Sequence, residues 1–216
     1  MQEIFPQHTI VTPNDEGLHF DPEETGLTFY ENSLIKAKAL WSMVHCPVIA
    51  DDSGICLDAL GGAPGIYSSR YAGPNFMQGS PDGKKVPQAE QNRMLVSQLN
   101  EALEKGVDLE QGKKQGLFAL GERTAHYTCA MVLYLGHERL YVAEEIMEGT
   151  IVERIEDARG TGGFGYDPLF YLPDFGKTAA ELTPDQKNAI SHRGKASRAL
   201  KNIVEGIMGA SKNFSF

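Results

Sequence analysis

Helix-like and strand-like segments alternate along this chain of 216 residues, and this alternation restricts the fold more than any other feature of the sequence. Apolar side chains recur with a helical period in three segments, which predict helices over residues 29–45, 91–105 and 194–208. Short apolar segments predict strands at residues 47–50, 124–135 and 140–147, and residues 149–156 can continue the sheet. Because the two kinds of element are interleaved and no linker divides them, we expect an α/β or α+β fold in a single domain over residues 1–216.

The charge of the chain restricts its partners. Twenty Lys and Arg residues against 29 Asp and Glu residues give a net charge of −9. Binding along a nucleic acid polymer needs a basic face and is not expected, whereas one small anion in a local basic pocket is compatible with this charge. The longest apolar run, residues 129–135, is too short to span a membrane, and three scattered cysteines fit a reducing compartment, so we expect a soluble cytoplasmic protein.

Two adjacent acidic residues, Asp51 and Asp52, follow the short strand at residues 47–50 and precede Ser53 and Gly54. In open α/β sheets, ligands bind at the carboxyl ends of strands. Carboxylates there suit Mg²⁺ and can orient or deprotonate a water molecule. The alternative is that the two acids only cap a turn before Gly54.

The first predicted helix carries a second group of polar residues. Glu23 and Glu24 precede it, where acids often complement the helix dipole. Asn32 and Lys36 are four residues apart and therefore share one face of the helix. That face could present an amide and a cation to a phosphate, or it could be solvated surface.

A glycine-rich segment, residues 160–167, matches the spacing of the dinucleotide-binding G-x-G-x-x-G fingerprint. That fingerprint requires a following helix, which Pro168 directly after Asp167 prevents. What remains is a loop with Phe164, Tyr166 and Asp167, and an aromatic face beside an acid suits a nucleobase pocket. Packing of the same aromatic residues in the core is the alternative.

Three basic side chains, Lys187, His192 and Arg193, fall within seven positions of an otherwise acidic chain. Such a cluster predicts a local anion site, and Ser191 can cap the helix that follows.

Taken together, five segments of the chain strongly resemble the inosine triphosphate pyrophosphatase (Ham1-like) family, in the family's order and over nearly the whole length. They are residues 23–32, 50–54, 62–73, 162–168 and 191–194. The resemblance implies a Mg²⁺-dependent hydrolase that converts ITP, dITP and XTP to the monophosphate and pyrophosphate. It also implies an elongated, two-lobed mixed-sheet fold with the active-site cleft between the lobes, and a homodimer.

The resemblance further implies a role for each matching residue. Asp52 would be a metal ligand and the general base, and Glu24 would be the second metal ligand. The remaining residues would bind substrate: Ser53, Lys36 and Asn32 near the phosphates, Phe164 by stacking on the base with Gly165, Tyr166 and Asp167 around it, and Lys187, His192 and Arg193 at the base and sugar-phosphate.

One departure from the family leaves an alternative open. Family members normally begin with an apolar strand and an Asn-x-x-Lys phosphate loop, and the given chain has no such segment. The first expectation is an active enzyme whose true start lies upstream; the alternative is a nucleotide-binding homologue that is catalytically impaired. A third interpretation, a pyrophosphatase for modified pyrimidines or dTTP, is disfavoured by residues 191–193. Residues 74–89 and 104–116 are polar stretches longer than the family's usual connections.

Overall fold

The computed structural model describes residues 5–6, 8–106 and 122–211 of the chain. Its helices are α1 (Phe29–Val44), α2 (Gln88–Glu104), α4 (Pro184–Ile190) and α5 (His192–Ser211). Its strands are β1 (Val48–Leu57), β2 (Thr124–Gly136), β3 (Arg139–Ile151), β4 (Phe170–Leu172) and β5 (Lys177–Thr178). Short 3₁₀ turns occur at Asp58–Leu60, Gly65–Tyr67, Ile155–Asp157, Pro173–Phe175 and Ala179–Glu181. No helix among these residues is long and apolar enough to cross a membrane.

The five strands form one sheet in the order β1-β2-β3-β4-β5, so neighbours in the chain are neighbours in the sheet. β4 pairs antiparallel with both β3 and β5, with Tyr171 opposite Thr150 on one side and Thr178 on the other. A tight turn at residues 136–138 joins β2 to β3, and all three of its residues have positive φ. The mixed α/β architecture predicted from the sequence is confirmed.

The contacts between Cα atoms divide the chain into two compact units. The first unit takes in the described residues of Met1–Asp52, Cys129–Glu145 and His192–Phe216. The second takes in those of Ser53–Thr128 and Ile146–Ser191. β1, β2 and β3 each begin in one unit and continue into the other. Neither unit is therefore a continuous piece of sequence.

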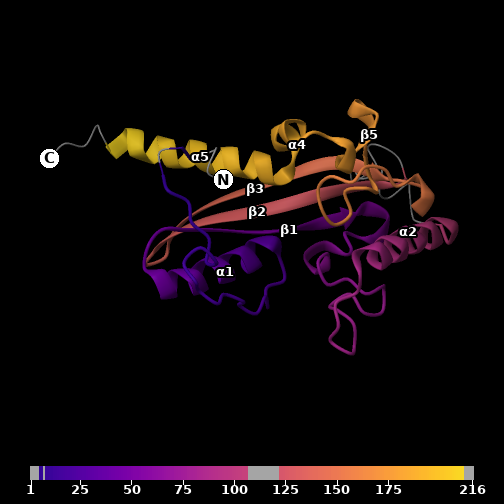
Figure 1. Ribbon diagram of the computed structural model, residues 1–216, viewed down its shortest axis with the longest axis horizontal. Helices are drawn as coiled ribbons and strands as arrows, with labels where there is room; N and C mark the ends of the chain where they lie inside the picture. Colours follow the sequence, from indigo (N-terminus) through magenta and orange to yellow (C-terminus); the bar gives the residue numbers. More distant parts are fainter. Residues whose placement is uncertain (1–4, 7, 107–121, 212–216) are drawn as a thin grey trace. The chain divides into compact units, whose positions relative to one another are not determined.

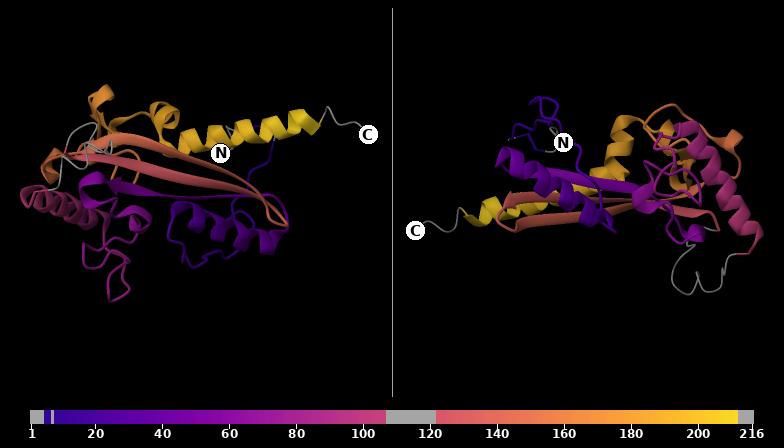
Figure 2. Two further views of the ribbon diagram at one scale, coloured as in Figure 1. Left: turned by 180° about the vertical axis from the view of Figure 1, so that it is seen from behind. Right: turned by 90° about the horizontal axis from the view of Figure 1, so that it is seen from below.

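In the first unit, α1 covers one face of the sheet and α5 covers the other (Figure 1). Figure 2 shows the same arrangement from behind and from below. Successive side chains of a strand point to opposite faces, so alternate residues of β2 join different cores. Val132 and Tyr134 pack with Ala37 of α1. Cys129, Met131 and Leu133 pack with Ala196 and Leu200 of α5.

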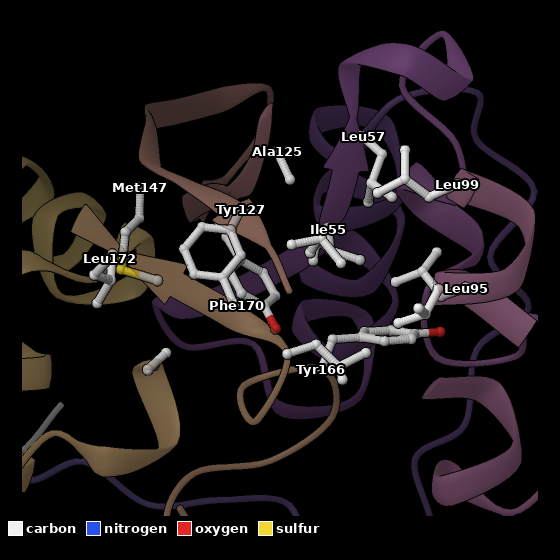
Figure 3. Packing of buried hydrophobic residues seen from close by; sticks show 14 of the residues in the cluster. Ile55, Leu57, Leu95, Leu99, Ala125, Tyr127, Met147, Tyr166, Phe170 and Leu172 are labelled. Carbon is white, nitrogen blue, oxygen red and sulfur yellow. The ribbon is translucent and has the colours of Figure 1, made fainter. Parts of the chain in front are cut away.

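The second unit has its own core, in which α2 packs against the strand residues of that unit (Figure 3). Leu95 and Leu99 of α2 are completely buried against Ile55 and Leu57 of β1. The rings of Tyr127 and Phe170 lie 4.8 Å apart, centroid to centroid, in the same cluster. This core holds the carboxyl-terminal half of β1 in place.

The predicted helices and the β2–β3 hairpin are confirmed to within a few residues. One local prediction is wrong, and one element was missed. The strand expected at residues 47–50 continues to Leu57, because burial of Ile55 and Leu57 in the second core stabilises the additional residues as strand. The short helix α4 was not predicted. The stretch at residues 74–89 is a loop as far as Pro87, whereas most of the stretch at 104–116 lies outside the described residues.

Candidate active site

A lysine and two carboxylates meet in the first unit. The ammonium of Lys36 donates hydrogen bonds to Glu24 Oε1 at 3.0 Å and to Asp52 Oδ1 at 2.9 Å. Their side chains are 18%, 23% and 11% exposed, in the order Lys36, Glu24, Asp52. Residues that the sequence analysis placed in separate segments are thus brought together by α1, by β1 and by the segment before α1.

Asn32 links Asp52 of this cluster to the segment before α1. It is completely buried, its Oδ1 accepts the backbone N–H of Gly26 at 2.8 Å, and its Nδ2 donates to Asp52 Oδ2 at 3.4 Å. Because Gly26 N–H is a donor, Oδ1 must face it, which turns the amide nitrogen toward Asp52. A Cβ on Gly26 would lie 2.7 Å from that Oδ1, so this close approach requires glycine. The amide predicted to lie near a phosphate contacts the Gly26 loop and Asp52.

The start and the packing of α1 fix the direction of Lys36. Thr28 caps the helix, with its hydroxyl accepting the N–H of Glu31 at 3.1 Å. Ser33 Oγ donates to the carbonyl of Ala50 at 2.8 Å and fastens α1 to β1. Because Asn32 and Lys36 are one helical turn apart, both then face the same stretch of β1.

Charge and burial act in opposite directions on this cluster. Burial raises the pKa of the Asp52 carboxyl, and the nearby charge of Glu24 raises it further; Lys36 offsets only part of this. Burial alone would lower the pKa of the Lys36 ammonium, but Asp52 and Glu24 together raise it above its usual value. One ammonium thus serves two carboxylates, and the three groups carry a net negative charge.

The donor set of this cluster fits Mg²⁺. The part of the chain that the structure describes holds no group of three or more His, Cys, Asp and Glu side chains placed to bind a metal. Mg²⁺, however, usually takes only one or two carboxylates and fills its octahedron with water and phosphate oxygens. Glu24 and Asp52 have oxygens within 3.0 Å of one common cation, the ammonium of Lys36. Two hard oxygen donors already gathered around a cation are what such an ion requires.

Asp51 was expected beside Asp52 at the end of a strand, and that expectation is wrong. Both residues lie within β1, so their side chains point to opposite faces of the sheet. Asp52 faces α1, whereas Asp51 faces α5 and its Oδ2 accepts the Nε–H of Arg193 at 2.9 Å. The sequence offers no sign of this partner, because Arg193 lies 142 residues further along the chain. Had the apolar residues 55–57 been included in the strand, its alternation would have separated the two acids.

An aromatic, an acid and a lysine form a second group, in the second unit. Asp167 Oδ2 accepts the ammonium of Lys187 at 2.5 Å and the backbone N–H of Phe164 at 2.7 Å. The Lys187 nitrogen lies 5.1 Å from the centroid of the Phe164 ring, and Phe164 is itself 57% exposed. A Cβ on Gly163 would lie 2.1 Å from Asp167 Oδ2, so glycine is required where the loop crosses this ion pair. The result is an exposed aromatic face on a fixed loop.

A capping box orients Lys187, which belongs to α4. Thr183 and Gln186 exchange side chain–backbone hydrogen bonds of 3.1 and 3.2 Å, and Pro184 occupies the first turn. Thr-x-x-Gln with Pro directly after the Thr is a helix start that the sequence displays plainly, and it was overlooked.

The other predicted site residues have varied surroundings. Tyr166 is buried in the second core and donates its hydroxyl to the carbonyl of Ser68 at 2.9 Å, as the core-packing alternative anticipated (Figure 3). Gly165 has a φ of +64° with no atom near its missing Cβ. Ser53 lies within β1. His192 is the first residue of α5 and is 4% exposed.

Two of the basic residues predicted to bind an anion already form ion pairs with carboxylates of the protein. Lys187 pairs with Asp167, and Arg193 pairs with Asp51. Lys36 likewise pairs with two acids. Each of these three cations is therefore paired with at least one carboxylate. An anionic ligand would either displace that carboxylate or bind the cation beside it.

The chain is similar to known proteins over most of its length. The model of the Ham1 family matches residues 1–203. A dITP/XTP pyrophosphatase of Treponema denticola is 47% identical over 206 residues, 95% of this chain and 92% of that protein. A protein of the same name from Bacillus subtilis is 43% identical over 183 residues, 85% of this chain and 78% of that protein.

Solved structures give the same result. The Ham1 protein of Staphylococcus aureus is 34% identical, with a TM-score of 0.73 over 95% of this chain and 91% of its own. A HAM1 protein of Coxiella burnetii is 33% identical, with a TM-score of 0.74 and the same two coverages. The similarity extends over both units.

Proposed function

The chain belongs to the Ham1 family, and from this premise we propose that it is a pyrophosphatase of non-standard purine nucleoside triphosphates. Its substrates are dITP, ITP and XTP, and its products are the nucleoside monophosphate and pyrophosphate. Relatives named dITP/XTP pyrophosphatase, at 42–47% identity, support the substrate class. The observation in this chain that supports the chemistry best is the meeting of Glu24 and Asp52 around the ammonium of Lys36.

The proposal assigns the phosphates to this cluster. Glu24 and Asp52 hold Mg²⁺, which when bound neutralises charge on the phosphate oxygens. Lys36 exchanges part of its contact with the two carboxylates for a phosphate oxygen, and Ser53 is a further phosphate contact. Asn32 keeps Asp52 and the Gly26 loop in register while Lys36 moves.

Asp52 is also the proposed general base. It accepts a proton from the attacking water as the oxygen of that water bonds to phosphorus. The phosphoanhydride bond between the α and β phosphoryl groups breaks, and pyrophosphate leaves. Burial raises the pKa of Asp52 in the metal-free protein.

The purine is assigned to the second group of residues. Phe164 stacks on the base, and Gly165 and Tyr166 belong to the loop that carries it. Lys187 and Asp167 hold that loop and offer polar contacts to the base. His192 and Arg193 donate toward O6, which would leave an adenine unmatched because its exocyclic amine is itself a donor.

The proposal also includes a homodimer, which the family resemblance implies. It includes a cytoplasmic location, for which the three scattered cysteines speak, and one catalytic domain over residues 1–216, for which the interleaving of helices and strands speaks. The alternative of a catalytically impaired homologue predicts nucleotide binding without turnover.

One assay tests the proposed function. Purified protein is incubated with dITP, XTP, dATP or dGTP, with Mg²⁺ or with EDTA, and pyrophosphate is measured separately from inorganic phosphate. We expect pyrophosphate from dITP and XTP at a kcat/KM at least about tenfold above that for dATP, and none with EDTA. Binding of dITP without any product would support the impaired homologue instead.

A further inference from the structure

The ion pair between Asp51 and Arg193 lies on the α5 face of the sheet in the first unit, opposite to Asp52. A hydrogen bond of 2.9 Å joins Asp51 Oδ2 to the Nε of Arg193. The two side chains are 33% and 45% exposed, so the pair is neither buried in the core nor loose on the surface. Its carboxylate is carried by a strand and its guanidinium by the first turn of α5.

A contact at Nε has a specific geometric effect. The guanidinium is a rigid planar fork, so holding its stem-side N–H fixes the plane in which the outer amino groups donate. A hydrogen bond between charged groups is also among the stronger ones available in a protein. Asp51 therefore restricts the direction in which Arg193 can donate.

Cys129 of β2 supports Asp51 in turn. Its Sγ lies 3.9 Å from Asp51 Oδ2, and the residue is completely buried. Burial raises the pKa of this thiol to about 12, so it stays protonated and can only donate toward the carboxylate. Cys129 of β2, Asp51 of β1 and Arg193 of α5 thus form one row of contacts that ends at the guanidinium.

We propose that Asp51 is a positioning residue that sets the purine selectivity of the enzyme through Arg193. The inference rests on the proposed function, in which Arg193 donates to O6 of the base. A fixed donor discriminates well, because an exocyclic amine placed opposite it cannot accept a hydrogen bond. Without Asp51 the contact at Nε is lost and the plane of the guanidinium is held less firmly, which reduces the penalty against adenine.

The test compares kcat/KM for dITP with kcat/KM for dATP in Asp51→Ala, Asp51→Asn and Arg193→Lys. Lysine keeps a cation but lacks the planar fork. We expect the dITP:dATP ratio to fall roughly tenfold in Asp51→Ala, the scale of one charge-assisted hydrogen bond, and less in Asp51→Asn, which keeps an acceptor. In the Arg193→Lys background, Asp51→Ala should lower the ratio no further, because its effect passes through Arg193.

Asp157→Asn is the matched control. Asp157 forms an ion pair with Arg154, with both contacts at 3.0 Å, on a 3₁₀ turn of the second unit. Its loss should leave the dITP:dATP ratio unchanged. If Asp51→Ala also leaves the ratio within about twofold of the wild type while Arg193→Lys lowers it, the proposal is wrong.

A second measurement does not depend on turnover. In protein labelled with ¹⁵N-arginine, the Nε–H signal of Arg193, identified by its absence in Arg193→Lys, should shift and exchange faster with water in Asp51→Asn. An unchanged signal would overturn the proposal even with the ratio altered. Failure of the proposed function looks different, because the wild-type protein itself would then release no pyrophosphate from dITP.

Discussion

At the scale of single residues, the site is governed by the cost of keeping two carboxylates close together with little water. Glu24 and Asp52 share the ammonium of Lys36, and Asp52 has in addition the amide of Asn32. These contacts offset part of the cost of ionising Asp52, whose pKa remains raised. The cluster has a net negative charge and can therefore accept a further cation.

Asp52→Asn should lower kcat by about a thousandfold, the usual scale for loss of a general base. The same change should not destabilise the protein at pH 7. Because the folded-state pKa of Asp52 is raised, its neutral form favours folding below the unfolded pKa, and that stability is lost as pH rises through the folded pKa. The substituted amide stays neutral at every pH, so the variant should unfold in urea at the same or a higher midpoint at pH 7. Turnover close to that of the wild type would exclude Asp52 as the base.

Lys36→Met should destabilise the metal-free protein by about 1–3 kcal/mol, because it leaves two partly buried carboxylates without their cation. Lys38→Met is the matched control on the same helix. Lys38 pairs with Glu138 at 2.8 Å in an exposed position, where an ion pair contributes little. Urea unfolding of both variants measures the difference. Equal losses would mean that the Lys36 contacts are no stronger than a surface pair.

At the scale of elements, β1 shows where sequence reasoning succeeds and where it fails. The apolar residues 47–50 predict a strand correctly, but the polar residues 51–54 look like its end. Only the distant partners of residues 55–57 in α2 show that the strand continues. Side chains alternate between the two faces of a strand. Because the strand was predicted to end at residue 50, the different surroundings of Asp51 and Asp52 were not predicted either.

The helices were easier to predict because their apolar periodicity is local. α1, α2 and α5 follow from it, and the motif residues on α1 do meet at Asp52. The partners of Lys187 and Arg193 did not follow, because those carboxylates lie 20 and 142 residues away in the sequence. Lys187, His192 and Arg193 were predicted to act together because they are close in the sequence. Their contacts are instead determined by the tertiary fold.

Gly163→Ala should raise the KM for dITP and reduce stability. Its φ of +72° disfavours any side chain, and a Cβ would lie 2.1 Å from Asp167 Oδ2 and 2.6 Å from the Lys187 ammonium. Gly176→Ala is the control, since Gly176 has a φ of +61° with no atom near its missing Cβ. Both variants should lose about 1–2 kcal/mol from the backbone, and only Gly163→Ala should lose more and bind dITP less well. An unchanged KM in Gly163→Ala would separate this loop from base binding.

At the scale of the whole molecule, three strands are common to two cores. Because β1, β2 and β3 each continue from one unit to the other, melting one core removes strand partners from the other. Unfolding should therefore be a single transition. The chain has one tryptophan, Trp41, and it lies in the first unit, which makes the coupling measurable.

Leu99→Ala in the second core and Leu200→Ala in the first should each cost about 2–5 kcal/mol, since both side chains are completely buried. We expect both substitutions to lower the urea midpoint seen by Trp41 fluorescence, and circular dichroism to give the same midpoint. If Leu99→Ala leaves the Trp41 transition in place, the two cores unfold independently.

The interrupted course of the chain also bears on how the protein is made. A ribosome releases every segment of the second unit by Ser191, whereas the first unit lacks α5 until the final stretch has emerged. Until then, Ala196 and Leu200 cannot cover the side chains of β2 on that face of the sheet, which are Cys129, Met131 and Leu133. Asp51 likewise lacks its ion-pair partner until then, because Arg193 is synthesised 142 residues after it. The row that we propose to set purine selectivity can thus form only after synthesis has reached Arg193 of α5.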